Sequence, residues 1–87
     1  MLSYTLLIKK QAKKALQSVS QPDRTRIAEK IVLLGKNPNN ASLDIKKLQG
    51  KPYFRLRVGQ WRIIFDRDSE VKIISIDKIK PRGGAYK

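Results

Sequence analysis

The feature that most constrains this fold is an alternation of apolar and polar side chains in two consecutive runs. Residues 53–58 and 61–66 each carry apolar side chains at every second position, and arginines stand between them in both runs. A period of two is typical of strands that bury one face and expose the other. Gly59-Gln60 separates the runs, and two residues are the length of the commonest hairpin turn. The sequence therefore predicts an antiparallel hairpin with an apolar face and a cationic face.

A first strand and two helices are predicted before this hairpin. Residues 2–8 alternate in the same way and predict a strand. Between Lys9 and Val19 small apolar residues recur at helical spacing, which predicts a short helix with a narrow apolar stripe. A second helix is expected to begin with Asp23 as its capping residue and to end at Gly35. Two helices joined by so short a connection form a helical hairpin with one apolar side.

The rest of the chain is predicted to hold a loop and one more strand. Residues 36–52 are rich in Asn, Pro, Gly and Lys, which favours a long ordered loop. Residues 71–76 are apolar on both faces, which indicates a strand inside the sheet and more central than its neighbours. The order of one strand, two helices and a three-stranded antiparallel meander predicts a single α+β domain over residues 1–87, with the helices packed on one sheet face.

The residue types that are missing exclude several kinds of chemistry. The 87 residues include neither cysteine nor histidine. Without cysteine there is no disulfide and no thiolate ligand for zinc. Without histidine there is no imidazole base and no Ser-His or Cys-His pair. We therefore expect no metal and no cofactor, and a fold that is held by packing alone.

The net charge points to a polyanionic partner. Lysine and arginine total 20 against 7 aspartates and glutamates, which gives a net charge of +13. Solubility usually needs a net charge of only about 2–8 in a small domain, so the excess favours binding to nucleic acid. The apolar start of the chain is too short for a signal peptide, and no run approaches the roughly 20 apolar residues of a membrane span. The sequence predicts a cytoplasmic protein without a membrane partner.

The cationic face of the predicted hairpin is the candidate site. With the apolar side chains turned to the helices, Arg55, Arg57 and Arg62 share the open sheet face. Like charges on neighbouring strands are unfavourable when they are directly opposed, and a bound anion relieves that repulsion. More cations precede the hairpin and follow the last strand: Lys46, Lys47, Lys51, Lys78, Lys80, Arg82 and Lys87. We expect a phosphate backbone to lie across this face.

Part of the predicted hairpin resembles a known family. Residues 48–50, followed by residues 53–65, are similar to the pattern L-x-G, an aromatic residue, R-x-R-x-G, a spacer, an aromatic residue and R-[IV]-[IV]-[YF] of the RelE/ParE toxins. The Asn-Pro pair at 37–38, after the predicted second helix, also fits the pattern of this family. The resemblance covers nearly the whole chain. Arg82 and Tyr86 have the spacing of the arginine and the valine- or alanine-tyrosine pair that end the RelE-type messenger-RNA interferases. The chain most resembles that branch.

The resemblance implies a fold, an activity and partners. It implies the RelE fold, with a strand, a helical hairpin and a meander, and the role of toxin in a type II toxin–antitoxin system. RelE-type interferases cut messenger RNA in the ribosomal A site, which implies a ribosome-dependent endoribonuclease that inhibits translation and binds an acidic, RelB-like antitoxin. ParE-type relatives share the R-x-R-x-G core and poison DNA gyrase, so a gyrase inhibitor stays an alternative, as does a small basic RNA-binding protein without activity.

Metal-free cleavage of RNA by the 2′ hydroxyl needs a base, cations around the phosphorus and an acid. Arginine keeps its proton, so Arg55, Arg62 and Arg82 are candidates for stabilising the developing charge. Tyr86 is the candidate proton carrier, with Lys51 as an alternative, because nearby cations favour proton loss from both. The residues expected to contact RNA are Lys46, Lys47, Lys51, Arg57, Lys78 and Lys80.

Three further residues receive structural interpretations. Asp66 and Asp77 are possible bases, but we favour them as ion-pair partners of the arginines, because such pairs are ordinary on a basic sheet. Trp61 falls on the apolar side of its strand and is expected to face the helices.

Overall fold

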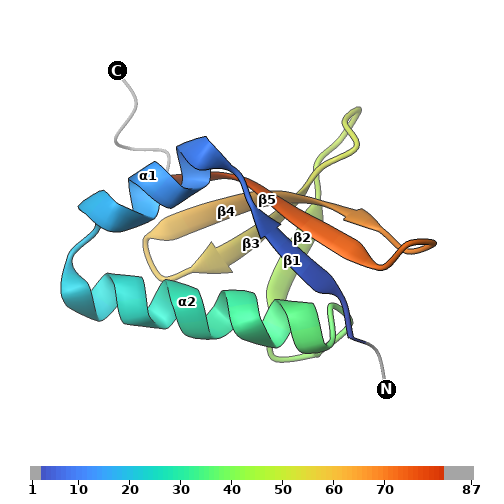
Figure 1. Cartoon of the computed structure of the whole chain (residues 1–87), viewed down its shortest axis with the longest axis horizontal. Helices are drawn as coiled ribbons and strands as arrows, with labels where there is room; N and C mark the ends of the chain where they lie inside the picture. Colours follow the sequence, from blue (N-terminus) through green and yellow to red (C-terminus); the bar gives the residue numbers. More distant parts are fainter. Residues whose placement is uncertain (1–2, 82–87) are drawn as a thin grey trace.

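The computed structural model describes residues 3–81, in which two helices cover one face of a five-stranded sheet (Figure 1). The strands lie in the order β1-β5-β4-β3-β2, with β1 parallel to β5 and the other neighbours antiparallel. The expected α+β class is confirmed. A membrane-spanning helix is not found within the described range. The elements are β1 (Thr5–Ile8), α1 (Lys10–Ser18), α2 (Gln21–Lys36), β2 (Asp44–Lys47), β3 (Phe54–Val58), β4 (Trp61–Asp68) and β5 (Ile73–Pro81).

The N-terminal strand and the first helix follow their predicted patterns. Tyr4 is buried and Leu6 and Ile8 are partly buried, whereas Leu7 between them is half exposed. The small residue Ala12 is the buried side chain of α1, and it lets the helix pack closely on β5. The apolar stripe of α1 therefore faces the sheet, and its lysines face outward.

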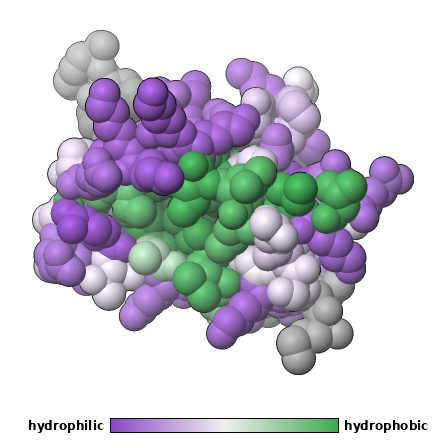
Figure 2. All heavy atoms as spheres, viewed as in Figure 1, coloured by the Kyte–Doolittle hydropathy of each residue, from purple (hydrophilic) through white to green (hydrophobic). Residues whose placement is uncertain are grey.

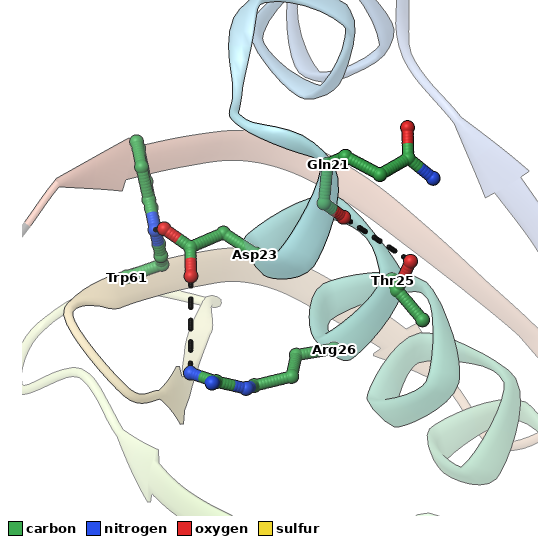
Figure 3. A network of polar contacts seen from close by, with 5 residues as sticks. All are labelled: Gln21, Asp23, Thr25, Arg26 and Trp61. Carbon is green, nitrogen blue, oxygen red and sulfur yellow. Dashed lines mark hydrogen bonds and ion pairs between the residues drawn. The ribbon is translucent and has the colours of Figure 1, made fainter.

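The second helix starts before the predicted cap. Ser20 is the N-cap residue, and Asp23 lies in the first turn. Pro22 also stands in this turn, where its missing N–H group is not needed. The Asp23 carboxylate accepts a hydrogen bond of 3.1 Å from Trp61 Nε1 and lies 3.8 Å from the Arg26 guanidinium (Figure 3). The prediction of Asp23 as the cap is wrong. Asp23 instead links α2 to β4, and Trp61 faces the helices as expected.

The second helix was expected to end at Gly35, but it does not end there. Gly35 is buried inside α2, which continues to Lys36. A Cβ atom at this position would lie 3.0 Å from Leu6 Cδ1. The glycine therefore permits close packing of β1 on the helix, and this contact explains its place in the sequence better than chain termination does.

A strand interrupts the segment that was expected to be one long loop. Asp44–Lys47 forms β2 and pairs with β3 at the edge of the sheet. Leu43 is buried and Ile45 is partly buried, whereas Asp44 and Lys46 are exposed. This alternation covers too few residues to predict a strand among the polar residues around it. The strand is stabilised by its pairing with β3, which the local sequence does not reveal.

The predicted hairpin is confirmed, and the last strand has different boundaries. Val58 pairs with Trp61 across the two-residue turn, in which Gly59 has a positive φ of 57°. Val71 was expected to begin the next strand, but it lies in the preceding turn with 61% of its surface exposed. β5 begins at Ile73, runs to Pro81 and has a neighbour on each side. It is an interior strand as predicted, although the middle strand of the sheet is β4.

The core lies between the helices and the sheet. Its largest fully buried side chains come from α2 and from the three interior strands, and they are Ile27, Leu34, Leu56, Ile63, Phe65, Ile74 and Ile76. Burying each of these side chains contributes about 1.5–3 kcal/mol to folding. The face that carries them is the face expected from the period-two pattern, so the opposite face of β3 and β4 is left open.

One arginine ties the two helices together. The guanidinium of Arg24, on α2, donates hydrogen bonds to three carbonyl oxygens near the end of α1: Leu16 at 3.2 Å, Gln17 at 3.2 Å and Val19 at 2.9 Å. The last carbonyls of a helix have no partner within the helix, and a charged donor forms strong bonds with them. Arg24 therefore satisfies the end of α1 and holds the helical hairpin closed.

We predict that Arg24→Met lowers the free energy of unfolding by about 1–3 kcal/mol, since it leaves carbonyls without their charged donor. Urea denaturation followed by the fluorescence of Trp61 measures the change. Arg26→Met is the matched control, because the one ion pair that Arg26 forms within residues 3–81 is its solvent-exposed contact with Asp23, whose loss should cost less than about 1 kcal/mol. Equal losses in the two variants would contradict this role for Arg24.

Candidate nucleic-acid interface

Two rows of cations cross the open face of the sheet. In the first row, Lys46 of β2 lies opposite Arg55 of β3. The same row continues with Ile64 of β4 and ends with Lys78 of β5. In the second row, Arg57, Arg62 and Lys80 lie opposite one another on β3, β4 and β5. Side chains that are opposite each other in a sheet point to the same face. We call this set the cationic rows, and its members are Lys46, Arg55, Arg57, Arg62, Lys78 and Lys80.

The surface is hollowed where the two rows meet. A depression of about 580 Å³ lies over β2, β3 and β4. Arg55 and Arg62, which are diagonal neighbours across two strands, both line it. Its remaining lining residues are Lys46, Lys47, Leu48 and Gln49. The depression therefore brings together two of the predicted catalytic arginines and two of the predicted RNA contacts.

The second row places like charges directly opposite each other. Arg57 faces Arg62 across the β3–β4 pair, and Arg62 faces Lys80 across the β4–β5 pair. Directly opposed like charges destabilise a sheet. An anion bound between two such cations attracts both of them, so it replaces their mutual repulsion with a net attraction. The register thus confirms the sequence expectation that the arginines share one face, and it adds Lys80 to their row.

The carboxylates that were expected to pair with the arginines are elsewhere. Asp77 lies 3.5 Å from Lys9. Asp66 lies beyond the β-bulge of β4, and within residues 3–81 it has no ion pair. The partner of Arg55 is Asp44, on the neighbouring strand β2, at 3.3 Å. The expectation is therefore wrong for Asp77, and within residues 3–81 no arginine pairs with Asp66.

The two arginines of the depression are held differently. The side chain of Arg55 is 18% exposed, and its terminal nitrogen reaches Asp44. In the described part of the chain, no carboxylate pairs with Arg62. The Nε atoms of both arginines are buried and meet no acceptor in that same part. The charge of Arg62 therefore has no carboxylate partner within residues 3–81, and both arginines keep an unused Nε donor there, which suits a surface that receives an external anion.

The other predicted site residues are spread more widely. Lys47 borders the depression, but its ammonium lies 5.3 Å from the centroid of the Phe54 ring and donates to the carbonyl of Lys51 at 3.1 Å. Lys51 itself is exposed in the connection between β2 and β3. Arg82 and Tyr86, and with them Lys87, lie outside the described residues, so their roles stay predictions.

Tyr4 is a buried tyrosine outside this site. Its hydroxyl lies 3.4 Å from the Ser69 hydroxyl, and Arg67 and Lys72 lie over its ring at 5.4 and 5.9 Å from the centroid. The hydrogen bond with Ser69, and then the nearby Arg67 and Lys72, lower the pKa of Tyr4. The tyrosine packs in the core on the helix side of the sheet, so we give it a structural role.

Asp44 is a residue of the open face that was not predicted from the sequence. It is the carboxylate within the row of Arg57 and Arg62, because the register places it opposite Arg57. The alternation of Leu43, Asp44 and Ile45 is the signal that could have placed it on the open face. Residues 36–52 were predicted to be a loop, so the strand that contains Asp44 was not predicted.

The arrangement can bind and polarise a phosphodiester. Guanidinium groups recognise phosphate oxygens through two parallel hydrogen bonds. Fixed cations also stabilise negative charge that develops on those oxygens. Residues 3–81 contain no group of three acidic side chains that could hold a metal ion.

Comparisons with solved structures place this arrangement among known proteins. The chain is 36% identical to the RelE of the archaeal RelE–RelB complex from Pyrococcus horikoshii OT3, with a TM-score of 0.83, and the match covers 95% of this chain and 99% of that one. It is 30% identical to a chain of the RelB–RelE antitoxin–toxin complex from Methanococcus jannaschii, with a TM-score of 0.76 and coverage of 93% and 95%.

A bacterial structure shares the fold at lower identity. The match to the intact Escherichia coli RelBE toxin–antitoxin complex has 17% identity and a TM-score of 0.76, and it covers 91% of this chain and 96% of that one. No protein-family model matches the sequence, and a search of proteins of curated function finds no match.

We predict that Asp44→Asn strengthens the binding of single-stranded RNA and steepens its salt dependence, because Arg55 gains freedom to contact phosphate. Each added phosphate contact changes the slope of log affinity against log salt by about 0.7. Asp66→Asn is the matched control, because it removes the same charge from the same face and Asp66 has no ion pair with an arginine within residues 3–81. Fluorescence anisotropy over a range of salt concentrations makes the comparison. The same slope in both variants would show that Asp44 does not restrain Arg55.

Proposed function

Because the chain belongs to the RelE toxin family, we propose that it is the toxin of a type II toxin–antitoxin pair and that it cleaves messenger RNA in the ribosomal A site. The observation that carries this proposal is the pair of cationic rows on the sheet face that neither α1 nor α2 covers (Figure 1). A phosphate backbone that crosses β3 and β4 meets Arg57 and Arg62 in one row and Arg55 in the other.

In the proposed reaction, the 2′ oxygen of a nucleotide attacks the adjacent phosphorus and the 5′ oxygen of the next nucleotide leaves. A base takes the 2′ proton, and an acid returns a proton to the leaving oxygen. The products are a 2′,3′-cyclic phosphate and a 5′ hydroxyl. Arg55 and Arg62 stabilise the charge that builds on the phosphorane oxygens. We assign removal of the 2′ proton to Tyr86 and further stabilisation of the phosphorane charge to Arg82.

The ribosome supplies what the sheet lacks. The open face offers cations, but the chain has no histidine to act as a strong base near neutral pH. Orientation of the reacting groups by another body can lower a barrier by about 7–11 kcal/mol. A messenger held in line by the ribosome therefore compensates for a weak base.

The test of the proposal compares messenger on programmed ribosomes with the same transcript free in solution. We expect cleavage at mapped positions on the ribosome and almost none in free RNA. Chelators should leave the rate unchanged once ribosome integrity is controlled. Efficient cutting of naked transcript at the same positions would refute ribosome dependence. DNA damage on expression, with intact messenger, would favour a gyrase-directed toxin instead.

Arg62→Ala and Tyr86→Phe should both impair cleavage, for separable reasons. Arg62→Ala removes a cation from the phosphorane oxygens and should lower the rate by about 10²–10³ and weaken RNA binding as well. Tyr86→Phe removes only a hydroxyl, so ribosome binding should persist while the rate falls by about 10²–10⁴. Single-turnover cleavage on programmed ribosomes, with a binding titration for each variant, measures both effects. A wild-type rate in Tyr86→Phe would move the search for the base to Lys51.

The proposed protein partner is an acidic, RelB-like antitoxin. The complexes from Pyrococcus horikoshii and Methanococcus jannaschii pair the related toxin with RelB, and the charge of +13 on this chain favours an acidic segment. We expect the association rate to fall steeply with salt, because exposed charges are screened beyond about 8 Å at physiological ionic strength. Stopped-flow mixing at several salt concentrations measures this rate. Equal rates at low and high salt would rule out electrostatic steering.

A further inference from the structure

A third row of side chains lies on the open sheet face, next to the first cationic row. Leu7 of β1 lies opposite Ser75 of β5, and Ser75 lies opposite Asp66 of β4. The backbone N–H of Leu48 donates to the carbonyl of Tyr53 at 2.9 Å and extends the β2–β3 pairing by one residue. We call this set the third row, and its members in spatial order are Leu48, Tyr53, Asp66, Ser75 and Leu7.

Tyr53 is the aromatic residue of the open face within residues 3–81. Phe54, the next residue in the chain, turns to the covered face, where its ring centroid lies 5.4 Å from that of Phe65. Alternation along the strand therefore turns the half-buried Tyr53 to the open face, on the same side as Arg55. The other aromatic residues of the described range lie in the core or contact α2: Tyr4 and Trp61.

The third row connects two hollows of the open face. Leu48, at one end, lines the depression that holds Arg55 and Arg62. Asp66, near the middle, lines a second hollow of about 580 Å³. Tyr53 stands between Leu48 and Asp66 in the row, and therefore lies between the two hollows. Other lining residues of the second hollow are Leu7, Pro52 and Ser75.

The charges of the second hollow exclude phosphate from it. Three carboxylates line this hollow, those of Asp66, Asp68 and Glu70. The guanidinium of Arg67 also lines it, but this group donates to the side-chain oxygen of Asn39 at 3.1 Å. A phosphate backbone is repelled by this excess of negative charge and attracted by the cationic rows beside it. RNA on this face therefore keeps its backbone on the cationic rows.

A nucleobase, by contrast, suits the third row. Successive side chains on one face of a strand are about 6.6 Å apart, which is within the span of one nucleotide. An aromatic ring stacks on the π face that every base has, and sheets that bind single-stranded RNA present aromatic residues in this way. The row also becomes apolar toward β1, where Leu7 is 50% exposed. Figure 2 shows a hydrophobic band at the level of β1 and hydrophilic side chains over α1.

We propose that the third row is a nucleobase subsite, in which the Tyr53 ring stacks on the base of a nucleotide whose phosphate is held at Arg55. This inference rests on the proposed function, because it concerns the RNA strand that is cut. Stacking fixes the rotation of the nucleotide about its backbone, and so orients its phosphate toward the arginines. A purine has the larger ring surface and should bind more tightly than a pyrimidine at this position.

The test uses a short RNA that carries 2-aminopurine as its single base, with abasic residues elsewhere and methylated 2′ hydroxyls that prevent cleavage. Stacking on an aromatic ring quenches the fluorescence of 2-aminopurine. We expect quenching at saturation by the wild-type protein and by Tyr53→Phe. Tyr53→Leu should bind about tenfold more weakly and lose the quenching. The slope of log affinity against log salt should stay the same, since no phosphate contact is removed. Wild-type quenching by Tyr53→Leu would overturn the proposal.

A strand that is abasic throughout separates stacking from a structural role of Tyr53. The wild-type protein and Tyr53→Leu should bind this strand equally, as measured by fluorescence anisotropy, and urea unfolding followed by Trp61 should give the same midpoint. A tenfold deficit on the abasic strand as well would refute stacking. Both measurements use RNA without ribosomes. Failure of wild-type cleavage on programmed ribosomes would therefore refute the proposed function and leave the nucleobase subsite to be judged by its own result.

Discussion

The rest of this structure depends on the burial of one face of β3 and β4 under the helices. Leu56 and Ile63 are fully buried on that face, and period two then forces Arg55, Arg57 and Arg62 onto the other face. The magnitudes decide the outcome. Each buried side chain contributes about 1.5–3 kcal/mol, whereas an opposed pair of exposed like charges costs about 1 kcal/mol or less. The core can therefore hold the cations in a register that they would not adopt by themselves.

That imposed register is what makes the open face suited to phosphate. Arg57 and Arg62 lie opposite each other and repel each other. The Nε atoms of Arg55 and Arg62 in the depression also have no hydrogen-bond partner within residues 3–81, so both features favour a bound anion. Asp44 compensates only one of the arginines, Arg55, and does so from an exposed position on an edge strand. The site is thus a rigid sheet surface with an excess of positive charge, which is the form of preorganisation that electrostatic catalysis needs.

The helices contribute to the site through their packing on the covered face of the sheet. Ala12 keeps α1 close to β5, and Arg24 fixes the position of α2 relative to α1. As a consequence, the helix layer supports the sheet whose open face carries the cationic rows.

Local pattern alone was enough to predict the hairpin, the helical pair, the open cationic face and the α+β class. These features depend on the period of the apolar residues and on turn chemistry, both of which act over a few neighbouring positions. The boundaries of α2 and the strand β2 were predicted wrongly, because Gly35 serves packing against Leu6 and β2 exists only by pairing with β3.

The parallel pairing of β1 with β5 and the ion pair of Arg55 with Asp44 were also beyond local pattern. They join residues far apart in the chain, and the register that aligns them is set by the whole sheet. The sequence by itself determined which residues are cations and which face of each strand they occupy. Only the tertiary structure decided which cations stand opposite one another, since that depends on strand order and long-range burial rather than on neighbours in the chain.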